Sequence, residues 1–231
     1  MKLTLTREFI TDALSFSVLD PKVRALYDLC FMCRHHMRNE IVVDKLRLIT
    51  RLHSTYLYND SPAWPGKPFS AEAAAHSLSQ SPVDHWFGAL STAEQLDSGL
   101  LLELHKRLMG VFDDINEEAA RSLASKYLHF HFPELFYVYD SRIASALALL
   151  MEGDCGFLAL ADFDFAYGRF HACCRKLTER ITPLVGRALS PRELDRVLRA
   201  WLDMEGARGK GQEARYETDA FPCTLSLASC T

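Results

Sequence analysis

The sequence predicts an all-α fold, and three observations lead to this prediction. Helix-start patterns recur along the 231 residues, and apolar residues between them recur at the three- and four-residue spacing of helices. Strand-like alternation is scarce, and the chain has no Asn-Gly or Asp-Gly pair of the kind that closes a tight β-hairpin. A hydrophobic content of 48% is enough to build a core.

Two helices are expected in the first quarter of the chain. One begins at Pro21 and carries apolar residues at helical spacing as far as Cys30, and the other covers Ile41 to Tyr58. The stretch from Asn59 to Ser70 holds three prolines and one glycine, so we expect a rigid loop there.

Later helices are marked by capping patterns, in which a short polar residue is followed by Glu three positions on. Such pairs are Ser91 with Glu94, Asp114 with Glu117, and Ser190 with Glu193. The first leads into the leucine-rich run 100–108, the second into a helix ending near His131, and the third into a closing helix as far as Asp203. Residues 206–231 are rich in Gly, Ser and Thr without a period, so we expect a flexible tail.

The charge distribution is uneven, although the chain as a whole carries a net charge of −4. Residues 165–200 hold eight Lys and Arg against three acids, a net charge of +5, whereas residues 81–120 hold eight acids against two bases, a net charge of −6. The basic segment is either a positive face for phosphates or an ordinary set of solvated helix faces.

The seven cysteines do not follow the spacing of a disulfide framework, and no leader-like or bilayer-spanning apolar run is seen. We therefore expect a reducing, cytoplasmic setting. Cys30 and Cys33 precede two histidines, but a structural zinc needs a second pair of ligands, which the sequence lacks. We predict no metal and no cofactor.

The stretch from Ala120 to Leu147 carries the strongest functional pattern. It predicts a helix, a break at Pro133, the aromatic run Leu135 to Tyr139, and a second helix that begins at Asp140. Asp is a preferred N-cap, which is reason enough for its presence. A carboxylate fixed beside free helix amides and approached through an aromatic wall is also a plausible reaction centre, because it can stabilise a developing positive charge or orient a water molecule.

This stretch resembles the helix-hairpin-helix DNA glycosylases that carry a Gly/Pro-rich loop and a catalytic aspartate, the HhH-GPD superfamily. The resemblance rests on residues 122–131, the segment 133–139, and Asp140-Ser141-Arg142, with a basic helix and a closing helix following in the same order. It implies a two-lobed helical fold with a cleft between the lobes, here residues 1–110 and 111–205 of one domain. The segment also resembles uncharacterised bacterial proteins associated with phage-defence neighbourhoods.

One segment departs from the family pattern. The family's hairpin carries a Leu-Pro-Gly-Val-Gly-like sequence that grips DNA phosphate, whereas this chain has the acidic, glycine-poor stretch from Phe112 to Glu118.

The resemblance assigns roles to individual residues. Asp140 takes the catalytic role, and Lys126, fourteen residues before it and the only lysine of its helix, is the second candidate catalytic residue. Bifunctional members use a lysine about where Arg121 stands, and arginine cannot form a Schiff base, so we expect a monofunctional enzyme that leaves an abasic site. A flipped base would stack on or bond to residues of the rigid loop and central helix: Tyr56, Tyr58, Asn59, Trp64, Tyr127, His129 and His131. DNA contacts are expected from Arg121, Ser141, Arg142, Arg175 and Lys176.

Some of these assignments have structural alternatives. The aromatic residues could be core residues, and one of the two histidines could cap the helix C-terminus. The substrate would be a damaged base or a modified one, such as a hypermodified cytosine of phage DNA. Two other functions stay open: a non-catalytic protein that uses the scaffold to bind DNA or a partner, and a hydrolase of free nucleosides or nucleotides.

Overall fold

The computed structural model describes residues 5–15, 20–52, 69–92, 96–112, 115–151 and 163–218, with side chains in the last helix described as far as Met204. All regular elements in these ranges are helices, so the predicted all-α class is confirmed. The helices are α1 (Arg7–Ser15), α2 (Pro21–Met32), α3 (Asn39–Leu52), α4 (Ala71–Gln80), α5 (Val83–Thr92), α6 (Ser98–Val111), α7 (Glu117–His131), α8 (Ser141–Leu150), α9 (Phe165–Val185) and α10 (Pro191–Thr218).

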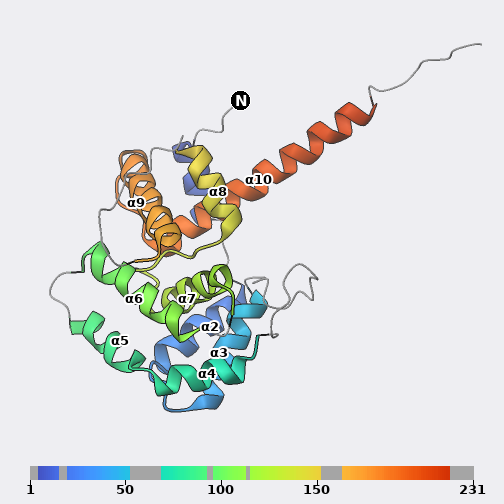
Figure 1. The fold of residues 1–231 in the computed structure, drawn as a ribbon. Coiled ribbons are helices and arrows are strands. Elements are labelled where there is room, and N and C mark those ends of the chain that lie inside the picture. Colours follow the sequence, from blue (N-terminus) through green and yellow to red (C-terminus); the bar gives the residue numbers. More distant parts are fainter. Residues whose placement is uncertain are drawn as a thin grey trace, which may run out of the picture.

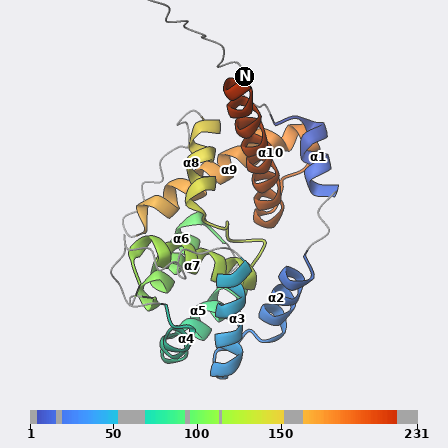
Figure 2. The same ribbon diagram turned by 90° about the vertical axis from the view of Figure 1, so that its right-hand side faces the viewer.

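The helices gather into two groups, each with its own cluster of buried apolar side chains (Figure 1). Helices α2 to α7 surround the first cluster, in which α7 packs against α2, α3 and α6. Helices α1, α8, α9 and α10 surround the second, and Figure 2 shows the same grouping from the side. The sequence placed a boundary between two lobes at residue 110, but the two clusters do not divide the chain there. Helix α1 belongs to the second cluster and α7 to the first.

Local side-chain bonds explain where several helices begin. Asp20 caps α2 by accepting a hydrogen bond of 2.8 Å from the Lys22 amide, and Pro21 occupies the first turn, where a missing N–H costs nothing. Ser190 and Glu193 form the predicted capping box of α10: the Ser190 amide donates to the Glu193 carboxylate at 3.0 Å, and the Glu193 amide donates to Ser190 Oγ at 3.4 Å.

Two predicted helix starts were placed wrongly. Ser91 lies in the last turn of α5, where its hydroxyl donates back to the Phe87 carbonyl, and α6 is capped by Asp97, whose carboxylate accepts from the Leu100 amide at 2.8 Å. Helix α7 is capped by Asn116, which accepts from the Ala119 amide at 2.9 Å. Residue 114, the predicted cap, lies outside the described residues.

The C-terminal helix continues past residue 206, where the sequence indicated the start of a tail, and runs to Thr218. Residues 219–231 lie outside the described part of the chain, so a flexible tail there stays a prediction. None of the helices in the described ranges combines the length and apolarity that crossing a membrane requires.

The described cysteines are in two oxidation states. Cys30, Cys33 and Cys174 are free thiols, and Cys173 is disulfide-bonded, which the cysteine spacing did not predict. A reducing compartment therefore stays a prediction from the sequence.

Candidate active site at the start of α8

Asp140 caps helix α8, as the sequence predicted. Its Oδ1 accepts hydrogen bonds from the amides of Arg142 at 2.9 Å and Ile143 at 3.2 Å. The side chain is 20% exposed, so the carboxylate is held in place but remains open to a small substrate or water. Arg142 Nε lies 3.9 Å from Oδ1, and 78% of the Arg142 side chain is exposed.

Two serines of α7 hold the segment that delivers Asp140. The Tyr139 amide donates to Ser125 Oγ at 2.9 Å, and Ser122 Oγ donates to the Tyr139 carbonyl at 3.3 Å. Tyr137 and Tyr139 are buried, as expected for a packed wall before the carboxylate. Because both serines bond the backbone of this segment, the position of Asp140 depends directly on α7, and sequence reasoning had assigned no role to either serine.

Lys126 lies close enough to Asp140 to interact with it electrostatically. Its side chain is only 2% exposed, and its ammonium donates to Ser122 Oγ at 2.9 Å. Burial lowers the pKa of Lys126 to about 8, while the charges of Asp140 and Asp195 oppose that shift and Arg199 adds to it. The charge of Asp140 thus acts on Lys126, the other candidate catalytic residue.

Helix α10 supplies three further charged residues to this region. Arg199 Nε donates to Asp195 Oδ2 at 2.8 Å, and Arg199 also interacts electrostatically with Asp140. The Arg192 guanidinium lies over the ring of Tyr27 from α2, 4.2 Å from its centroid. In the sequence these arginines stand out only as part of a basic segment, although Arg192, Asp195 and Arg199 follow one another at spacings of three and four residues, which puts them on one face of a helix.

His129 lies three residues after Lys126 on α7, and its side chain is buried as well. Its Nδ1 lies 2.7 Å from the Phe136 carbonyl, so Nδ1 carries the proton, and Nε2 then accepts from the Tyr27 hydroxyl at 2.6 Å. Burial lowers the pKa of His129, which keeps the ring neutral. His129 therefore joins α2 to the segment leading to Asp140 and is not open to a substrate.

Tyr127 and His131 point into the first apolar cluster instead. The Tyr127 hydroxyl lies 2.7 Å from His36 Nε2, and His36 Nδ1 lies 2.6 Å from Asp84 Oδ1. His131 Nδ1 bonds the Tyr127 carbonyl at 2.8 Å, and its Nε2 lies 3.1 Å from Lys45 Nζ. Both side chains are buried and have contacts with the α2–α3 region, so the structure does not bring them to Asp140.

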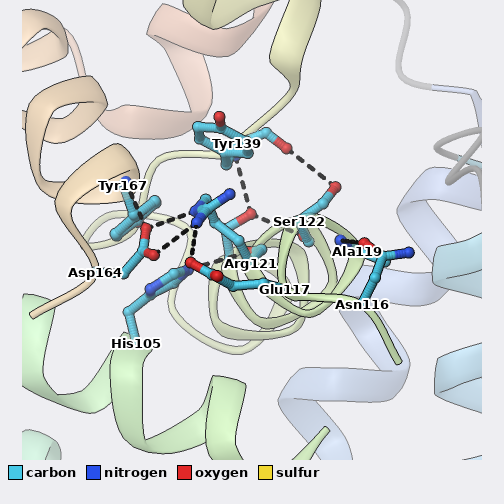
Figure 3. Close-up of polar contacts among 10 residues, drawn as sticks. His105, Asn116, Glu117, Ala119, Arg121, Ser122, Tyr139, Asp164 and Tyr167 are labelled. Carbon is cyan, nitrogen blue, oxygen red and sulfur yellow. Dashed lines mark hydrogen bonds and ion pairs between the residues drawn. The ribbon is translucent and has the colours of Figure 1, made fainter. Parts of the chain in front are cut away.

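Arg121, a predicted DNA contact, is held inside the protein by two carboxylates (Figure 3). Its Nε and Nη2 donate to the two oxygens of Asp164 at 2.6 and 2.8 Å, and Nη2 also donates to Glu117 at 2.8 Å. Although burial opposes ionisation, the bonds from Arg121 lower the pKa of Asp164. Arg121 is 9% exposed, and this bridge between α7 and the start of α9 accounts for its presence.

The remaining predicted site residues lie in three places. Ser141 and Arg142 form the first turn of α8 beside Asp140. Arg175 and Lys176 lie on α9, where Arg175 Nη1 donates to Ser98 Oγ at 2.8 Å. The predicted base contacts just before and within the rigid loop (Tyr56, Tyr58, Asn59 and Trp64) lie outside the described residues.

Within the part of the chain that the structure describes, no group of three or more His, Cys, Asp or Glu side chains is arranged to hold a metal ion. Comparison with known protein families, characterised proteins and solved structures finds no match to this chain. The resemblance to HhH-GPD glycosylases therefore stays a prediction from the sequence.

Proposed function

We propose that this chain is a monofunctional DNA glycosylase that hydrolyses the N-glycosidic bond of a damaged or modified base. The observation that carries the proposal is Asp140, a partly exposed carboxylate anchored by two amides of α8 and lying in the electrostatic field of Lys126. A charge held in one position before the reaction begins is what stabilises a cationic transition state most effectively.

The proposed reaction breaks the bond between C1′ of the sugar and the base nitrogen. The bonding electrons leave with the base, which takes up a proton, and positive charge develops on the sugar ring. Asp140 stabilises that charge through its carboxylate, and a water molecule adds to C1′ and gives up a proton. The products are the free base and an abasic site. Since the target base must leave the duplex to reach the carboxylate, the enzyme would act on a flipped nucleotide.

Lys126 supports the monofunctional assignment. A lyase needs an amine that can attack C1′, and a pKa near 8 would give Lys126 a substantial neutral fraction at mildly alkaline pH. However, its side chain is 2% exposed and bonded to Ser122, so Nζ is not presented to a sugar. We therefore assign Lys126 to positioning the carboxylate by charge rather than to covalent attack.

DNA would be held by exposed cations near the site. Arg142 is well placed, because it is 78% exposed and follows Asp140 by two residues. Ser141 offers a hydroxyl in the same turn. Arg175 and Lys176 on α9 would contact the phosphate backbone further away. Arg121 is left out of this set because its guanidinium is already engaged by Asp164 and Glu117.

A non-catalytic DNA- or partner-binding scaffold is the second candidate, and one observation favours it. The two amide bonds to Asp140 are those of an ordinary helix cap, which is a complete structural reason for the residue. A hydrolase of free nucleosides would use the same carboxylate without needing the DNA contacts.

One experiment separates these functions. DNA carrying ordinary bases, common lesions or hypermodified phage cytosines is incubated with the protein, and abasic sites are counted. Asp140→Asn should abolish base release while keeping the helix, since Asn is an equally good cap. Asp97→Asn is the matched control, because Asp97 caps α6 through a similar bond of 2.8 Å to Leu100. The control should retain full activity.

Each outcome of this experiment supports a different one of the three functions. Base release from one substrate that requires Asp140 establishes the glycosylase and identifies its target. Release from free nucleosides but not from DNA supports the nucleoside hydrolase, and DNA binding without any release supports the scaffold. Borohydride trapping of a covalent protein–DNA complex that disappears in Lys126→Met would replace the monofunctional assignment with a lyase.

A further inference from the structure

A pocket of about 490 Å³ lies where the end of α6, the start of α7 and the start of α9 meet. This volume falls in the range of small-molecule sites, roughly 300–1,000 Å³. Its walls are mostly apolar and include Met109, Phe112 and Ile115 on one side and Phe163 and Phe165 on the other. It is separate from the Asp140 site, since Asp140 is not among the residues that line it.

The aromatic walls offer flat surfaces for stacking. Phe112 is buried, whereas Phe165 is 63% exposed, which is unusual for such a large apolar side chain. The ring of Phe163 lies against the backbone of Gly168 in α9: a Cβ atom at residue 168 would sit only 2.2 Å from that ring. Gly168 therefore permits the position of Phe163, and a planar ligand could stack on these rings as bases do on aromatic platforms.

The polar side chains that line the pocket are Lys106, Glu117 and Asp164, and of its two carboxylates only one is open. Glu117 lines it, and 77% of the Glu117 side chain is exposed. Its Oε1 accepts from Arg121 Nη2 at 2.8 Å, which restrains the carboxylate (Figure 3). Asp164 also lines the pocket, but its side chain is 7% exposed and both oxygens accept from Arg121. Glu117 is thus the acceptor that a ligand can reach.

An ionised carboxylate only accepts hydrogen bonds, so it selects a ligand with N–H donors. Guanine presents two adjacent donors, the N1–H and the exocyclic amino group, which match the two oxygens of one carboxylate. Adenine and cytosine place a ring-nitrogen acceptor beside their amino group, and a carboxylate repels that lone pair. We propose that this pocket binds a guanine-type base, stacked on the phenylalanines and paired through two N–H donors with Glu117.

The base could belong to a free nucleoside or to a single strand of nucleic acid, and the chemistry of recognition is the same for both. The proposal does not depend on the glycosylase function, because it concerns binding at a site without Asp140. Asp140→Asn should therefore bind guanine like the wild type, whether or not base release is ever observed.

The test is calorimetric titration of the full chain with guanosine, inosine and adenosine, and with an oligothymidylate that carries a single guanine. Inosine keeps N1–H but lacks the amino group, so it should bind about tenfold more weakly than guanosine, and adenosine more weakly still. Saturable binding of guanosine identifies a free nucleoside as the source. Binding of the oligonucleotide alone, lost when its guanine is replaced by hypoxanthine, identifies a strand.

Variants test the residues themselves. Glu117→Gln should weaken guanosine binding by roughly 10–100-fold, because the amide replaces one acceptor with a donor. Glu118→Gln is the matched control: Glu118 is exposed and adjacent but does not line the pocket, so binding should be unchanged. Gly168→Ala should also weaken binding, since the new methyl group displaces Phe163.

The proposal is overturned if neither guanosine nor the oligonucleotide binds saturably, or if guanosine, inosine and adenosine bind equally. Equal binding by Glu117→Gln and Glu118→Gln would overturn it as well. Thermal unfolding will show whether the Glu117→Gln variant folds. If it does not fold, the difference in affinity between guanosine and inosine for the wild type still tests whether the pocket recognises guanine through two N–H donors.

Discussion

The Tyr27 hydroxyl donates a hydrogen bond of 2.6 Å to Nε2 of His129, and the other nitrogen of this imidazole donates to the Phe136 carbonyl at 2.7 Å. One buried ring thereby joins α2 to the segment that ends at Asp140. The two bonds also determine the tautomer of His129, because a carbonyl can only accept.

Removing the tyrosine hydroxyl should destabilise the protein. Tyr27→Phe leaves Nε2 of His129 buried without its donor, at a cost of about 1–3 kcal/mol in the free energy of unfolding. Urea denaturation measures this cost. The double variant Tyr27→Phe/His129→Leu should lose less than the sum of the two single variants, since each single change leaves a partner unsatisfied. Additive losses would contradict the coupling.

Lys126 should make stability depend on pH in the alkaline range. Burial lowers its pKa from 10.5 to about 8, so between these values the unfolded state binds more protons than the folded state. The contribution of Lys126 to stability therefore rises with pH across this window. Below pH 8 the folded protein bears the full cost of burying the charged ammonium, on the order of 3 kcal/mol.

Replacing this lysine with methionine removes the titration. Lys126→Met should be more stable than the wild type at pH 7, and the difference should shrink as the pH rises from 8 towards 10.5. Urea denaturation of both proteins at each pH is the measurement, and comparison at equal pH cancels most other titrations. A difference that stays constant from pH 7 to 10 would mean that Lys126 is not perturbed.

The Arg121–Asp164 pair should matter far more than a surface pair. Arg121→Met leaves the 7% exposed Asp164 carboxylate without its charged partner, which should cost roughly 3–5 kcal/mol of unfolding free energy. Arg107→Met is the control, because Arg107 forms a pair with Glu103 in which both side chains are about half exposed. That change should cost at most about 1 kcal/mol. Similar losses in both variants would show that Arg121 is not a structural bridge.

The acid response of the same pair has a definite direction. The pKa of Asp164 is lowered in the folded state, so its contribution to stability is present above the ordinary carboxyl pKa of 3.8 and is lost as the pH falls through the lower, folded value. In Arg121→Met the free energy of unfolding should depend much less on pH in this acidic range. Urea denaturation of the variant and the wild type at a series of acidic pH values measures the difference.

Interactions within a few residues were the ones that the sequence predicted well. These are the all-α class, the start of α2 at Pro21, the cap at Asp140, and the box of Ser190 with Glu193. The two caps each depend on a side chain and an amide two or three positions away. The Ser91 pattern failed because a competing cap, Asp97, lies six residues further on, and a local pattern does not reveal which of two candidates the chain uses.

In the candidate site, too, the sequence identified some residues but not their surroundings. Asp140 and Lys126 were selected from their own segment, and the structure shows Asp140 as the predicted cap of α8. Tyr127 and His131 share that segment, but they face the opposite cluster, where His36 and Lys45 hold them. Spacing along a helix shows which residues share a face but does not show what that face meets.

The sequence by itself thus determined the helical class, several helix ends and the carboxylate at the start of α8, because capping and apolar periodicity act over one or two turns. Only the tertiary structure decided what surrounds that carboxylate. Asp195 and Arg199, which influence the pKa of Lys126, are about seventy residues away from it in the sequence. The hydrogen-bonded pair of Arg121 and Asp164 is separated by 43 residues. Such pairs form because burying two helix faces together stabilises them, and that energy depends on packing across the whole chain rather than on any local pattern.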